Sequence, residues 1–82
     1  KKKILLKNIN LLVNKSELDK VIFVKVRSTG KLLEAKIHLH KNNSAKVELK
    51  IPEDGISPGQ ACVFYNKDDL GYKVLGGGWI SN

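Results

Sequence analysis

Apolar and polar residues alternate strictly along residues 33–40 and again along residues 46–51. In both runs the odd-numbered positions are apolar and the even-numbered positions carry a charged or imidazole side chain. This period of two is typical of a β-strand with one buried face. Lys41-Asn42-Asn43-Ser44 lies between the runs and predicts a turn, so the two strands should form a hairpin.

The apolar positions of this hairpin predict its register. Matching them places Leu39 opposite Val47, and His38 then faces Glu48 on the outer surface. A slip of one residue would set leucines opposite lysines, which makes that slip unfavourable.

A preceding strand is predicted over residues 21–26, which are mainly β-branched and aromatic. Two registers are open for its pairing with the strand after it. Turn chemistry favours Arg27 opposite Lys31, whereas apolar matching favours Val26 opposite Leu33.

The other segments are short and separated by turns. Residues 1–12 are predicted to form a linker and a lead-in strand, and residues 15–20 one helical turn. Two further strands are predicted, at 60–65 and 72–75, joined by a turn at 66–71. About six strands with short connections predict an all-β fold, a small antiparallel barrel closed or nearly closed. Gly76-Gly77-Gly78 predicts a bulge or a close backbone approach, and Trp79 is expected to plug the barrel.

Composition narrows the class of protein. Eighty-two residues make one small domain, and the complete lack of methionine indicates a piece of a longer polypeptide. No apolar run is long enough to cross a membrane, and one cysteine gives no disulfide framework, so a cytoplasmic setting is expected. The net charge of +7 favours an anionic partner, although lysine and asparagine enrichment is also typical of an AT-rich genome.

Candidate catalytic and metal-binding residues are few. Cys62 sits mid-strand among apolar neighbours and reads as a core residue, since a nucleophilic thiol needs a nearby cation, imidazole or helix N-terminus. His38 and His40 form an H-x-H pair without the further ligands of a structural zinc site, so no metal is expected. The glycine run lacks the following Lys and Ser or Thr of a phosphate-binding loop.

The remaining carboxylates give no acid–base pair. Glu53-Asp54 and Asp68-Asp69 are sequence neighbours in loops and read as solvated turn residues. No nucleophile–base pair is therefore apparent, and a free-standing enzyme is disfavoured.

Basic residues on the outer strand faces are the candidates for binding RNA. Such a surface can hold phosphates without reading bases. The residues are Lys25, Arg27, Lys36, Lys46 and Lys50.

Two segments carry a family resemblance when they occur together. They are Ile56-Ser57-Pro58-Gly59-Gln60-Ala61-Cys62-Val63-Phe64-Tyr65 and Val74-Leu75-Gly76-Gly77-Gly78-Trp79-Ile80. Asn8-Ile9-Asn10-Leu11-Leu12 and Val24-Lys25-Val26-Arg27-Ser28 add to it. With these runs the chain resembles the bacterial tRNA-specific 2-thiouridylases, over most of its length.

The resemblance implies a C-terminal β-barrel, similar to the second-domain barrel of translation elongation factors. The parent enzyme would use ATP and a persulfide sulfur donor, supplied through a sulfur-relay protein, to thiolate the tRNA wobble uridine. Residues 1–82 would form one non-catalytic domain that helps bind tRNA and packs on the upstream catalytic domain. The ATP-pyrophosphatase domain, the central domain and the catalytic cysteines would lie outside this sequence, and Cys62 matches neither of those cysteines.

One alternative stays open. The barrel could be a structural module that braces neighbouring domains without touching RNA, and an exposed apolar patch would favour that interpretation.

Overall fold

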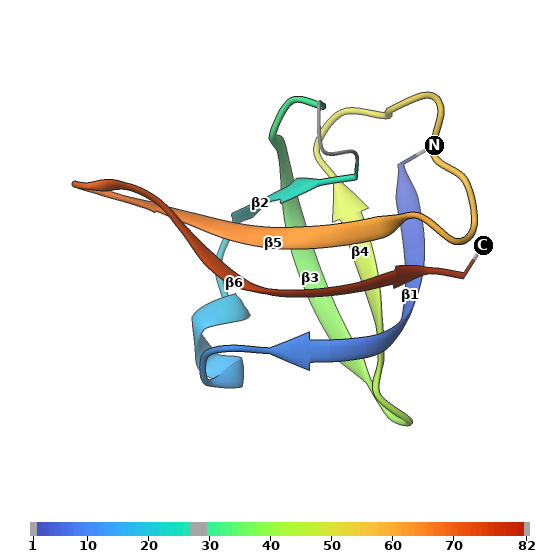
Figure 1. The fold of residues 1–82 in the computed structure, drawn as a ribbon, viewed down its shortest axis with the longest axis horizontal. Coiled ribbons are helices and arrows are strands. Elements are labelled where there is room, and N and C mark those ends of the chain that lie inside the picture. The colour runs from blue at the N-terminus through green and yellow to red at the C-terminus, as the bar shows by residue number, and fades with distance from the viewer. Residues whose placement is uncertain (1, 27–29, 82) are drawn as a thin grey trace.

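Six antiparallel strands close into a barrel in the computed structural model, which describes residues 2–26 and 30–81. The strands are β1 (Lys3–Leu11), β2 (Ile22–Lys25), β3 (Leu33–His40), β4 (Ser44–Leu49), β5 (Ala61–Asp68) and β6 (Gly71–Ile80). Around the barrel their order is β1-β4-β3-β2-β5-β6, with β6 pairing back to β1 (Figure 1). Closure pairs the sheet edges that an open sheet would expose. The predicted all-β barrel is confirmed.

The predicted helical turn is also present, as a single 3-10 turn. It is η1 (Lys15–Leu18), and it carries Leu18 into the core. The side chain of Asn14, which precedes it, makes no capping hydrogen bond. Within the described residues, no helix is long and apolar enough to traverse a bilayer.

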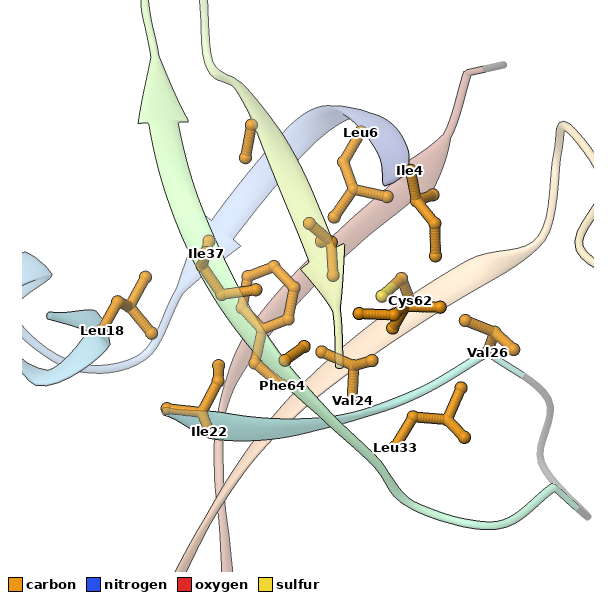
Figure 2. Packing of buried hydrophobic residues seen from close by; sticks show 14 of the residues in the cluster. Ile4, Leu6, Leu18, Ile22, Val24, Val26, Leu33, Ile37, Cys62 and Phe64 are labelled. Atoms are coloured by element: carbon orange, nitrogen blue, oxygen red, sulfur yellow. The ribbon is translucent and has the colours of Figure 1, made fainter. Parts of the chain in front are cut away.

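The inward positions of the strands fill the barrel with apolar side chains. The largest of the fully buried ones are Phe64, Ile4, Leu6, Ile22, Leu49, Leu75 and Ile80. Figure 2 shows the Phe64 ring in the middle of this cluster. No polar or charged side chain is buried among the described residues, so desolvated polar groups do not oppose this packing.

The register between β3 and β4 differs from the predicted one by two residues. Leu39 lies opposite Ala45 and not Val47, and the other pairs shift with it. A two-residue slip keeps every side chain on its face, so apolar matching alone does not exclude it. The turn sets the register instead, because Asn42 and Asn43 both take left-handed φ angles, of 62° and 57°.

The pairing of β2 with β3 also differs from both proposed registers. Val24 lies opposite Leu33, so Val26 does not pair with Leu33. The observed register is also one residue away from the one that places Arg27 opposite Lys31. Arg27 itself lies outside the described residues.

β6 is longer than predicted and runs through the glycine segment without a break. Leu75 is an extra residue in its pairing with β5, since Phe64 faces Gly76 while Tyr65 faces Val74. The bulge bends the strand and lets Leu75 and Gly76 both lie buried. The predicted bulge is confirmed.

The predicted close backbone approach is confirmed as well. A Cβ on Gly76 would collide with the backbone of Asn10 and Leu11 in β1, and a Cβ on Gly77 would collide with the carbonyl oxygen of Cys62 in β5. Gly76 also has a φ of 144°, which side-chain-bearing residues rarely adopt. Glycine therefore lets β6 close the barrel between β1 and β5.

The ends of β5 and β6 project from the barrel as a two-stranded ribbon (Figure 1). Its turn is shorter than the predicted 66–71, because pairing continues to Asp68 opposite Gly71. Tyr72 holds the ribbon near the barrel through an edge-to-face contact with Phe23, at a ring separation of 5.7 Å.

Candidate nucleic-acid interface

Three of the five candidate basic residues lie on one outer surface of the barrel. Lys36 is on β3, Lys46 is on β4, and Lys50 follows the end of β4. Lys36 and Lys46 point outward because both of their sequence neighbours are buried, and Lys50 is exposed. Lys25 is on β2, where its partner in β5 is Val63. We call the outer surface of β3 and β4 the lysine face.

Two glutamates are interleaved with these lysines. Lys36 faces Glu48 across the strand pair, and the Lys50 Nζ lies 3.5 Å from the Glu34 Oε2. His38 Nε2 lies 3.5 Å from the Glu48 Oε1, a diagonal contact between the strands. These side chains are well exposed, so each ion pair contributes little to stability.

A hollow of about 400 Å³ opens beside the lysine face. Lys2, Lys36 and Lys50 line it together with Glu34 and Glu48. Because carboxylates share the hollow, it is poorly suited to a single enclosed phosphate. An extended backbone of phosphates that runs over the outermost ammonium groups suits such a surface better.

Cys62 is a core residue, as predicted. Its side chain is completely buried and forms no disulfide. Burial raises the pKa of the Cys62 thiol from its usual 9.0 to about 12. The thiolate, which is the nucleophilic form, is therefore not populated at neutral pH.

The structure also places the two histidines and one of the loop carboxylates. His38 and His40 share a face of β3, but the part of the chain that the structure describes holds no cluster of three or more metal-ligating side chains. Asp68 is a turn residue, whose Oδ1 accepts a hydrogen bond from the Leu70 backbone N–H at 2.8 Å.

The prediction for Trp79 is wrong. Ile80 takes the inward position, so Trp79 points outward and is 49% exposed. Phe64 fills the core in its place. Alternation along the last residues of β6 places neighbouring residues on opposite faces, so Trp79 faces outward where Ile80 faces inward.

Trp79 borders a shallow groove of about 250 Å³ on the outside of β5 and β6. Gly76, Gly77 and Gly78 line the groove between Val74 and Trp79 without side chains to fill it. Leu12 and Val63 also line it, and Leu12 is 64% exposed. We call this groove and its apolar border the apolar face. Sequence reasoning missed it.

The fold and its surface define a small antiparallel barrel with lysines on one outer side and apolar side chains on another. Family comparison identifies it further. The profile of the aminomethyltransferase β-barrel domain family matches residues 1–80, and the chain belongs to that family.

Several curated relatives are tRNA-specific 2-thiouridylases named MnmA. That of Cereibacter sphaeroides strain KD131 is 54% identical over 59 residues, which cover 72% of this chain and 15% of the relative. That of Orientia tsutsugamushi strain Boryong is 49% identical over 72 residues, which cover 88% of this chain and 17% of the relative. The chain thus spans only about 15% of these proteins, and the resemblance to 2-thiouridylases is confirmed.

Proposed function

We propose that the barrel is the non-catalytic C-terminal domain of a tRNA-specific 2-thiouridylase, the enzyme that transfers sulfur to the 2-position of the tRNA wobble uridine. The observation that carries this is the 54% identity to a relative of that name. ATP and the persulfide donor would act in other domains of the parent enzyme. A sulfur-relay protein would supply the donor in the cytoplasm.

Within that enzyme, the barrel would help hold tRNA through the lysine face and would pack against the upstream domain. Lys36, Lys46 and Lys50 would approach phosphates of the tRNA backbone. Phosphate contacts position an RNA without reading its bases, which suits a face that carries charge but presents no aromatic platform. Lys25, which lies on β2, and Arg27 would add further phosphate contacts.

The test is tRNA binding by the full-length parent enzyme that carries Lys36→Gln, Lys46→Gln and Lys50→Gln together. We expect weaker binding and a shallower dependence of log affinity on log salt, by about 0.7 to 0.9 for each phosphate that a lysine no longer neutralises. A charge-matched control replaces the exposed Lys15, Lys41 and Lys67 with glutamine. Equal affinity and equal salt slope in both triple variants would reject the role of the lysine face.

The apolar face supports a second candidate function, a bracing module without RNA contact. Leu12, Val74 and Trp79 are all more than 40% exposed around one groove. An exposed patch of this kind marks an interaction surface. Bracing alone would leave tRNA affinity unchanged in the lysine variant, so the same binding experiment separates the two functions.

A further inference from the structure

The outer surface of the barrel has a charged side and an apolar side. On the lysine face, charged side chains occupy the outward positions of β3 and β4, including Glu34, Lys36 and Lys46. On the outside of β5 and β6 the outward positions instead include Val63 and Trp79. One small barrel therefore presents two surfaces that suit different partners.

We propose that the apolar face is the surface by which the barrel docks on the remainder of its own polypeptide. This inference rests on the proposed function, because it takes the chain as one domain of a longer enzyme. The occupant would be an apolar protein surface that inserts a side chain into the groove over Gly77, between Val74 and Trp79.

The aliphatic side chains of the groove favour protein over RNA. Leu12, Val63 and Val74 are aliphatic, so they neither stack on bases as aromatic rings do nor hydrogen-bond to them. Apolar side chains of a partner would cover them, and this burial is favourable in proportion to the apolar area removed from water. Trp79 is suited to anchor such a contact, since tryptophan is enriched among the residues that dominate protein interfaces.

Positive charge at the border of the groove indicates that the partner carries negative charge around its apolar centre. Lys7 is the neighbour of Trp79 in β1. An ammonium group beside an apolar centre fits a protein surface whose rim carries a carboxylate, because complementary rims steer and orient docking.

The position of the groove fits an occupant from the same chain. The first strand begins at Lys3, four residues before Lys7, so about 13 Å of strand separates the start of β1 from the Trp79 border. β6 ends at the same end of the barrel, where the Ser81 N–H donates to the Leu5 carbonyl oxygen at 2.8 Å. In relatives of which this chain spans about 15%, most of the polypeptide remains available to cover the groove.

The test measures thiol labelling at single positions in the full-length parent enzyme by peptide mass spectrometry, first without tRNA and then with it. Val74→Cys reports on the apolar face, and Leu12→Cys is a second reporter from another segment. Ile51→Cys is the matched control, because Ile51 is 72% exposed and lies outside the groove. Cys62 is buried and stays silent in the folded protein.

We expect labelling at residues 12 and 74 to be at least about tenfold slower than at residue 51, as for a surface that opens only transiently. Equally fast labelling at all three positions would overturn the proposal. Fast labelling that becomes slow only on addition of tRNA would also overturn it and assign the face to RNA. The lysine variants test tRNA binding by another surface, so the two proposals can fail separately.

Discussion

Trp79 and Ile80 are neighbours in sequence and lie on opposite sides of the barrel wall. Ile80 is completely buried, whereas half of Trp79 is open to solvent. The larger side chain therefore lies at the surface, and the smaller one lies in the core. This inverts the usual expectation for a lone tryptophan in a small domain.

Substitutions at these two positions should separate their roles. In the 82-residue chain, Ile80→Ala should lower the free energy of unfolding by about 2–5 kcal/mol, because it leaves a cavity in a packed core. Trp79→Ala should lower it by only about 1 kcal/mol, since much of its side chain stays in water when folded. Urea unfolding measures both, and an equal or larger loss at Trp79 would contradict its outward placement.

The glycine segment provides a second prediction, on barrel closure. Gly77→Ala should destabilise the chain by about 2–3 kcal/mol, because the new Cβ would meet the backbone of Cys62 and Val63, which cannot move aside cheaply. Gly78→Ala is the matched control. Its Cβ would meet chiefly the mobile end of Ile9, at 2.6 Å, and should cost less. Thermal unfolding measures the stability of both variants. A larger loss of stability for Gly78→Ala than for Gly77→Ala would contradict the close approach of β6 to β5.

Cys62 should link stability to alkaline pH. The unfolded thiol loses its proton above about pH 9, while the folded thiol keeps its proton until about pH 12. Raising the pH through that window therefore favours the unfolded state, by up to about 1.4 kcal/mol per pH unit.

The measurement is the free energy of unfolding between pH 9 and 12, for the wild type and for Cys62→Ala. The two proteins differ only at residue 62, so the difference between the slopes isolates the thiol. The wild type should lose stability more steeply. Parallel slopes, or rapid alkylation of Cys62 in the native protein at neutral pH, would show that the thiol is not buried as described.

The barrel follows from the sequence to a large extent. Alternation over residues 33–40 predicts which side chains face inward. In the structure Leu33, Ala35 and Ile37 are buried, as that pattern predicts. The same alternation does not fix the register, because Ala45 and Val47 are both inward-facing partners for Leu39. Two asparagines in left-handed conformation decide between them, and that preference is a property of the turn.

The surface was harder to predict. Lys36 and Lys46 could be placed outside from the strand pattern alone. The apolar face could not, because it depends on the bulge at Leu75, which shifts the alternation along β6 and turns Trp79 outward. A strand that contains three glycines gives no periodic signal across them.

We propose that the barrel helps to hold tRNA and takes no part in the sulfur-transfer chemistry. Single-turnover thiolation by the full-length parent enzyme tests it most directly, with the variant Lys36→Gln, Lys46→Gln, Lys50→Gln compared with the wild type over a range of tRNA concentrations. The account predicts that the variant needs more tRNA for half-maximal rate and reaches the same maximal rate at saturation. A lower maximal rate with unchanged tRNA dependence would contradict it.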